Sequence, residues 1–149
     1  MSVIGKRTIY VGPVDGSDSK PLNHEGLAVA AIAPGTTLSK SAAGFAASAV
    51  AATVFGQLWL IADKDQMRSK SVDTAWTINE NMVAIQPRSG EFVNALVVTG
   101  QALEIGTALT RNGAGLLVIA ATDGTEEIVA YSDEKVTTTA TQLVRVRKA

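Results

Sequence analysis

The side chains of this sequence that could carry out a reaction are few. His24 is the only histidine and there is no cysteine, so a Ser-His-Asp triad would have to use His24, and the usual ligand sets of zinc are missing. Asp15, Asp18 and Glu25 could gather around a hard cation, but they lack the fixed glycine and the terminal glutamate of a calcium loop. We therefore interpret His24 as a solvated or interface histidine, and we predict no catalytic residue, metal site or cofactor.

The remaining charged residues do not suggest a reaction or a polyanionic partner. Glu126 and Glu127 are adjacent, so a β-strand would direct them to opposite faces, and they could not share a substrate. No glycine pattern resembles a phosphate-binding loop that opens a helix. The chain has 13 basic and 14 acidic residues, so the positive field of a nucleic-acid-binding surface is missing. We expect a non-enzymatic function that depends on binding surfaces, and we expect no nucleic-acid partner.

No segment is expected to enter a membrane. The most apolar stretch, residues 27–62, is interrupted by Pro34, Lys40 and several glycines and consists largely of alanine. Such a stretch has too little continuous transfer energy for a bilayer span. The N-terminus carries charges where a signal peptide would have its apolar core, so we do not expect secretion either.

Short aliphatic runs separated by turn residues predict an all-β fold. Residues 57–63 alternate cleanly, with Leu58, Leu60 and Ala62 on one face. Residues 27–33 fit a strand that ends at Pro34, and residues 36–55 favour a hairpin around Gly44, with a helix as the alternative because alanine is abundant. Asn112-Gly113 lies between apolar runs, a strong hairpin signal. Together these patterns predict roughly eight to ten short strands, and hence a small β-barrel or sandwich.

The chain is expected to have two parts. Residues 1–26 contain "GPVDGSDSKP", a cluster typical of turns, and are predicted to form an extended N-terminal arm. Residues 27–149 are predicted to form one β-barrel domain, in which the polar excursion of residues 64–81 is pinned to the body by Trp76. Within the arm, Thr8, Ile9, Tyr10 and Val11 could add as a strand to a partner's sheet.

Residues 88–118 resemble the core signature of the head decoration proteins of tailed bacteriophages, also called capsid cement proteins. The similarity consists of a Gly-x-x-Val-Asn-Ala-Leu run, a Gly-Gln dipeptide, a Gly-x-x-Leu step and an Asn-Gly-x-Gly-x-Leu turn. It is carried by Gly90, Val93, Asn94, Ala95, Leu96, Gly100, Gln101, Gly106, Leu109, Asn112, Gly113, Gly115 and Leu116. A looser similarity extends over residues 27–148, but the segment after Asp63 departs from the glycine-rich loop that the family often has there.

This resemblance implies a structural virion protein without catalysis. It implies a small β-barrel, commonly a homotrimer, that binds the major capsid protein on the outer surface of the mature phage head and stabilises it. The site residues that it implies are scaffold positions, while the four arm residues are the candidate capsid contact.

Two other functions remain as alternatives. An all-β carbohydrate-binding or adhesin-like module would need exposed aromatic rings, and most of the aromatic residues stand at core-like positions. The sequence "ADKDQ" around Lys64 resembles the Asp-Lys-Ala turn of lipoyl carrier domains, but no second, similar hairpin half is present. We expect Lys64 to stay unmodified.

Overall fold

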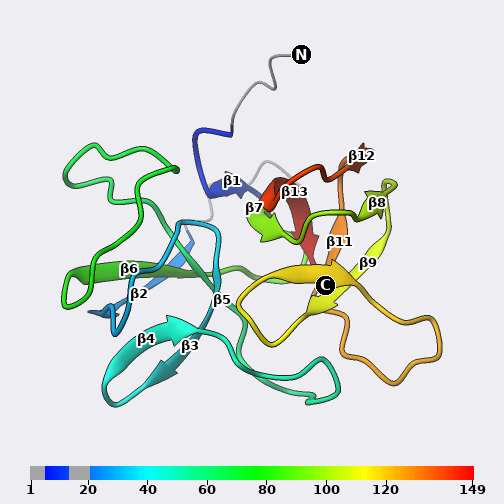
Figure 1. Ribbon diagram of the computed structural model, residues 1–149, viewed down its shortest axis with the longest axis horizontal. Coiled ribbons are helices and arrows are strands. Elements are labelled where there is room, and N and C mark those ends of the chain that lie inside the picture. Colours follow the sequence, from blue (N-terminus) through cyan, green and yellow to red (C-terminus); the bar gives the residue numbers. More distant parts are fainter. Residues whose placement is uncertain (1–5, 14–20) are drawn as a thin grey trace.

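The computed structural model describes residues 6–13 and 21–149, and within those ranges the fold is all-β, without a helix. The strands are short, in keeping with the frequent turn residues. They are β1 (Tyr10–Gly12), β2 (Leu22–Leu27), β3 (Thr37–Ser41), β4 (Gly44–Ala47), β5 (Leu60–Ala62), β6 (Asn81–Gln86), β7 (Phe92–Val97), β8 (Ala102–Leu103), β9 (Ala108–Arg111), β10 (Leu117–Ile119), β11 (Ala130–Ser132), β12 (Val136–Thr137) and β13 (Gln142–Lys148). Figure 1 shows their arrangement.

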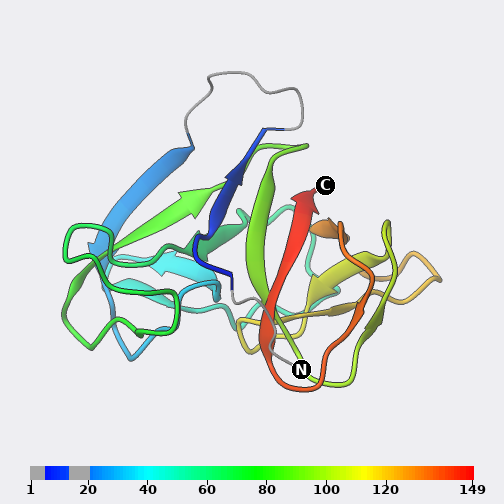
Figure 2. The same ribbon diagram turned by 90° about the horizontal axis from the view of Figure 1, so that it is seen from above.

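Five of these strands close into a barrel. Their order is β7-β10-β9-β11-β13, and β13 pairs back to β7, so the ring is complete. The barrel fits the predicted alternation, because Val93, Ala95 and Val97 on β7 and Val144 and Val146 on β13 are all buried in its core. Figure 2 shows β7 and β13 side by side. The predicted small β-barrel is confirmed.

A second sheet has its own core. It has the order β2-β6-β5-β3-β4, and an isolated bridge between Ala28 and Phe45 brings its two ends together. Phe45, Leu38 and Met82 are buried between its strands, as is Trp76 from the excursion. The described residues therefore contain two large sheets, each with its own core, and a small two-stranded sheet of β8 and β12, where the sequence analysis expected one barrel.

Strand β5 lies between the two cores. Leu60 and Ala62 belong to the core of the second sheet, whereas Trp59 and Ile61 belong to the core of the barrel. The alternation predicted for residues 57–63 is thus confirmed from Trp59 to Ala62, where both faces are buried because a core packs on each side, whereas Gln57 and Leu58 precede the strand and are exposed.

The turns follow the glycine signals. β3 and β4 form the hairpin expected in residues 36–55, and at Gly44, with φ 130°, a Cβ would meet the Leu27 carbonyl oxygen at 2.1 Å. β9 and β10 form the hairpin expected at Asn112-Gly113, but its loop spans residues 112–116 rather than two residues. The loop is longer because the Asn112 Oδ1 accepts hydrogen bonds from the backbone N–H groups of Ala114 and Leu116, at 2.8 and 3.2 Å.

The N-terminal part differs most from its prediction. β1 pairs with β7 of the barrel and β2 pairs with β6, so the described residues of the expected arm belong to the two sheets. The boundary expected after Gly26 falls inside β2, and the strand expected over residues 27–33 is reduced to single bridges at Ala28 and Ile32. The polar sequence of β2 concealed it, because an edge strand with an exposed face carries few apolar residues. Residues 1–5 and 14–20 lie outside the described residues.

Candidate interaction surfaces

The N-terminal strand is built into the barrel. Ile9 is fully buried in the barrel core. The Asn94 backbone N–H donates to the Ile9 carbonyl at 2.7 Å, and the Asn94 Nδ2 donates to the Thr8 carbonyl at 2.7 Å. Tyr10 lies opposite Val93 in the pairing of β1 with β7.

The sequence analysis expected the strand formed by Thr8, Ile9, Tyr10 and Val11 to be available to a partner's sheet. One edge of this strand is instead paired with β7 of the same chain. The reason is that the burial of Ile9 and two bonds from Asn94 favour the intramolecular sheet. Thr8 and Val11 remain exposed at the surface. A capsid contact by these residues stays a prediction for the outer edge of β1 alone.

Replacing Asn94 with alanine should loosen β1. Asn94 is buried, and its side chain carries one of the two bonds that hold residues 8 and 9. Loss of a buried hydrogen-bond donor costs about 1 to 2 kcal/mol, so we expect a loss of that size in the free energy of unfolding, with faster amide exchange at Tyr10 to Gly12. Thr8→Ala is the control, because it leaves both backbone acceptors in place and removes only the exposed bond from the Thr8 Oγ1 to the Tyr10 carbonyl. Equal effects of the two variants would show that Asn94 does not fasten the strand.

The signature glycines stand at turns of the barrel. Gly90, Gly100, Gly106 and Gly113 have φ values of 88°, 80°, 91° and 77°, in the left-handed region that favours glycine. Gly106 donates a backbone hydrogen bond to the Ser132 carbonyl at 2.7 Å, which joins two loops of the barrel.

The other signature residues belong to β7 or brace it. Val93 and Ala95 point into the core, and Leu96 is half-buried. The Gln101 Oε1 accepts a hydrogen bond from the Ile119 backbone N–H at 3.0 Å, and Asn112 shapes the loop that precedes β10. These residues build the barrel and do not converge on one pocket.

The residues considered for chemistry are dispersed. His24 on β2 is half-buried, and its Nε2 lies 2.8 Å from the Gln86 Oε1. Glu25 beside it is exposed, and Asp15 and Asp18 lie outside the described residues. Over residues 6–13 and 21–149, no group of three His, Asp or Glu side chains could hold a metal ion.

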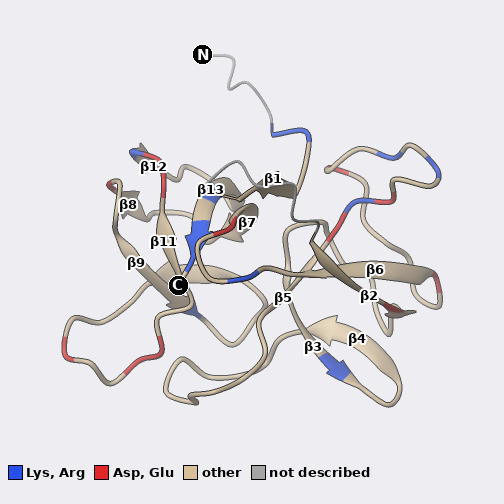
Figure 3. Cartoon of the chain, turned by 180° about the vertical axis from the view of Figure 1, so that it is seen from behind, with Lys and Arg blue, Asp and Glu red and all other residues tan. Residues whose placement is uncertain are grey.

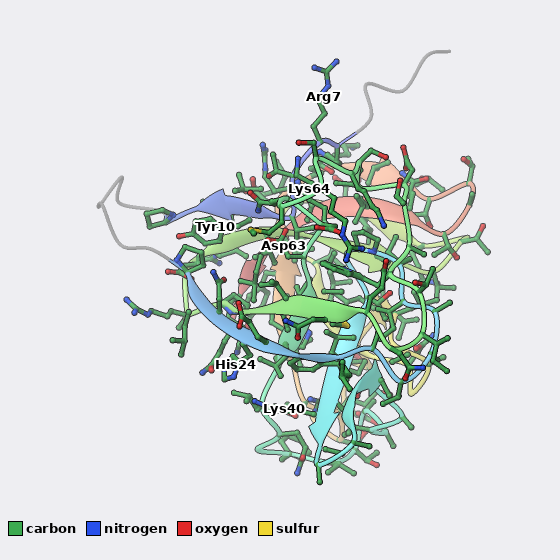
Figure 4. All side chains as sticks on the ribbon, turned by 90° about the vertical axis from the view of Figure 1, so that its left-hand side faces the viewer. Arg7, Tyr10, His24, Lys40, Asp63 and Lys64 are labelled. Atoms are coloured by element: carbon green, nitrogen blue, oxygen red, sulfur yellow. The ribbon has the colours of Figure 1, made fainter. Side chains whose placement is uncertain are left out.

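Lys64 begins the excursion between β5 and β6. Its Nζ donates to the Arg7 carbonyl at 2.9 Å, and Figure 4 shows it beside Asp63 and close to the N-terminal strand. Burial raises the pKa of Asp63, while hydrogen bonds from Gln66 and from the Lys64 backbone oppose this shift. The lysine thus links two segments and does not cap a tight hairpin turn, as a lipoyl lysine would.

The excursion is fastened to the body by Trp76, and an ion pair braces it internally. The Trp76 Nε1 donates to the Asp63 carbonyl at 2.7 Å and its ring is buried, as predicted. Arg68 Nη1 lies 2.7 Å from the Glu80 Oε1. The Thr77 backbone N–H, together with Arg68 and Lys70, lowers the pKa of Glu80 to about 2.

Aromatic rings are largely covered. Phe45, Trp59 and Trp76 are buried, and Arg147 lies over the half-buried Tyr131 ring at 5.6 Å from its centre. Phe55 is the one exposed aromatic residue of the described chain. A row of rings on which a sugar could stack is therefore absent from residues 6–13 and 21–149.

A groove of about 910 Å³ runs beside the barrel. Its apolar lining includes Pro34, Leu96 and Leu143, and its charged lining includes Lys6, Asp133, Glu134 and Arg145. Four charged groups of the lining form two pairs, Lys6 with Glu134 and Arg145 Nε with the Asp133 Oδ2 at 2.6 Å, and the remaining two, Asp73 and Lys135, have opposite signs. These pairs leave the groove without a marked charge preference.

A second surface is apolar. Residues 48–59 connect β4 to β5 without forming a strand, and three of their side chains, Val54, Phe55 and Leu58, are 42, 58 and 52% exposed. Ile128, on the facing segment before β11, is 38% exposed. We call these four residues the apolar loop face.

A buried ion pair lies beneath this face. Arg111, at the end of β9, has a side chain only 2% exposed and pairs with Glu127. Its Nη2 also donates to the Val54 carbonyl at 3.0 Å. The sequence analysis did not single out Arg111. Its position at the end of an otherwise apolar strand was the one sequence feature that indicated a buried charge.

No protein-family model matches this chain, and the curated proteins contain no match to it. Within the described chain, no helix is long and apolar enough to cross a membrane.

Proposed function

We propose that the protein is a structural virion protein of a tailed phage, which binds the outer surface of the mature head and stabilises it. The observation that carries this proposal is the similarity of residues 88–118 to the head decoration family. In the structure the similar residues form β7, β9 and the turns around them, so the pattern coincides with the framework of the barrel.

The body of the protein suits such a role. Two packed cores give a compact β-body, and among the described residues β1 and β2 are end strands of their sheets. Edge strands and exposed apolar side chains are where β-proteins meet their neighbours. We propose the major capsid protein as the partner and a homotrimer as the form that binds, since several weak contacts made together reinforce one another.

Binding to heads tests the proposal. The full-length protein is mixed with expanded and with unexpanded empty heads of the phage that encodes it, and bound protein is measured after sedimentation. We expect saturable binding to expanded heads, weaker binding to unexpanded heads, and release of DNA from filled heads at a higher temperature when they are decorated. Preferential binding to the expanded state is what stabilises it.

The oligomeric state is measured separately, by native mass spectrometry of the free protein and by counting copies on decorated heads. A trimer mass, or occupancy in threes at local symmetry axes, agrees with the proposal. Failure to bind expanded heads at concentrations far above those of the capsid sites would contradict the proposed function.

A further inference from the structure

The apolar loop face is held in a fixed shape by hydrogen bonds from below. The Glu127 backbone N–H donates to the Ala52 carbonyl at 2.8 Å, and the Gly56 N–H donates to the Glu127 Oε1 at 3.2 Å. Arg111 binds the Glu127 Oε2 and the Val54 carbonyl. Four bonds around one buried ion pair therefore fix residues 52–56, on which Val54 and Phe55 are displayed.

Exposed apolar side chains on a fixed loop are typical of a binding surface. Three apolar side chains of one short loop keep about half of their contact with water in the folded protein, 42, 58 and 52% for Val54, Phe55 and Leu58, although burying a phenylalanine or leucine side chain fully stabilises a protein by about 1.5 to 3 kcal/mol. A loop that is already ordered loses little conformational entropy when a partner binds, which favours affinity. The arrangement thus combines unburied apolar area with a preformed shape.

The exposed charges on the two loops of this face are acidic, and the nearby Lys148 is half-buried, with its Nζ 6.0 Å from the centre of the Trp59 ring. Residues 41–62 contain no charged side chain, and residues 112–128 contain Asp123, Glu126 and Glu127 but neither lysine nor arginine. Glu127 is neutralised by Arg111, so Asp123 and Glu126 remain on the loop that borders the face. Figure 3 shows this loop with acidic residues alone, next to the uncharged loop 48–59.

We propose that the apolar loop face is the docking site for a protein surface that has an apolar centre and a rim of lysine or arginine. We assign this partner surface to the major capsid protein, an assignment that rests on the proposed function. Charge complementarity selects the partner, because acidic groups at the rim attract a cationic surface and repel an acidic one. A second copy that met this face through its own would set Asp123 and Glu126 against the same residues, which disfavours a symmetric self-contact.

Phe55→Ser tests the site. Phe55 is exposed, so the variant should unfold at the same temperature as the unchanged protein, while its binding to expanded heads should weaken at least tenfold. Ile78→Ser is the matched control, because Ile78, in the excursion, is 61% exposed, and its binding should be unchanged. Glu126→Lys should weaken binding at low salt and have a smaller effect at high salt.

Crosslinking identifies the occupant independently of binding strength. The full-length protein with a photoreactive phenylalanine at position 55, or at position 78 as control, is produced in infected cells and irradiated. A crosslink from position 55 to the major capsid protein, absent from position 78, is the expected result. A crosslink to a second copy or to another protein, or no crosslink, overturns the proposal.

The two hypotheses fail differently. If the unchanged protein binds expanded heads and Phe55→Ser binds them equally well, the docking site is refuted and the proposed function stands. If the unchanged protein does not bind heads and gives no crosslink to the capsid protein, both are refuted.

Discussion

Glu127→Ala should lower the free energy of unfolding by about 3 kcal/mol, because it leaves the Arg111 guanidinium buried without an opposite charge. Removing one partner of a buried ion pair costs about 3 to 5 kcal/mol, and the lower figure applies because the Glu127 side chain is 21% exposed. The Arg111 Nε has no hydrogen-bond partner among the described residues, so the pair with Glu127 is its principal compensation. Chemical denaturation followed by tryptophan fluorescence measures the loss.

Two further variants separate charge from packing. Asp123→Ala, in the same loop but exposed, removes only the acceptor of two exposed hydrogen bonds from Thr125 and should lower stability by no more than about 1 kcal/mol. The double variant Arg111→Met with Glu127→Met should recover most of the loss, because apolar side chains of similar size can replace a buried ion pair. If Glu127→Ala is as stable as Asp123→Ala, the ion pair does not hold the loop, and the fixed shape of the apolar loop face must have another cause.

The regular part of this fold could be predicted because it depends on local patterns. The alternation in β5 and β13, the hairpin at Gly44 and the turn at Asn112 are each encoded within a few residues. β13 shows this well: Val144 and Val146 are buried while Arg147 is exposed, as the period of two requires.

The parts that could not be predicted depend on contacts between distant residues. The burial of Ile9 requires β7, more than eighty residues further along the chain, and nothing in "TIYVG" distinguishes a strand that joins its own barrel from one that joins a partner. The burial of the Arg111 side chain likewise depends on its bonds to Glu127 and to the Val54 carbonyl, which lie on other segments. The second core was missed because the residues that enclose it come from residues 28–32, from β3 to β6 and from the excursion, and no local pattern links these segments.

Gly115 is the point at which the barrel touches the second sheet. Its N–H donates to the Ser48 carbonyl at 3.0 Å, and its carbonyl accepts from the Thr37 N–H at 2.8 Å. A Cβ there would lie 2.7 Å from the Thr36 Cγ2 and 3.0 Å from the Ala47 Cβ. The contact between the β9–β10 turn and the β3–β4 hairpin therefore leaves no room for a side chain.

Gly115→Ala should consequently cost about 3 kcal/mol or more, of which about 1 to 2 kcal/mol is the left-handed backbone and the rest the displacement of close-packed atoms. Gly100→Ala is the matched control: its φ of 80° is nearly the 79° of Gly115, but a Cβ at Gly100 meets nothing within 4 Å. It should lose only the backbone part, about 1 to 2 kcal/mol. Thermal and denaturant unfolding of the two variants measure the difference, which isolates the packing between the two sheets. Equal losses would mean that the barrel and the second sheet are not in contact at Gly115, and that the two sheets are joined mainly through β5.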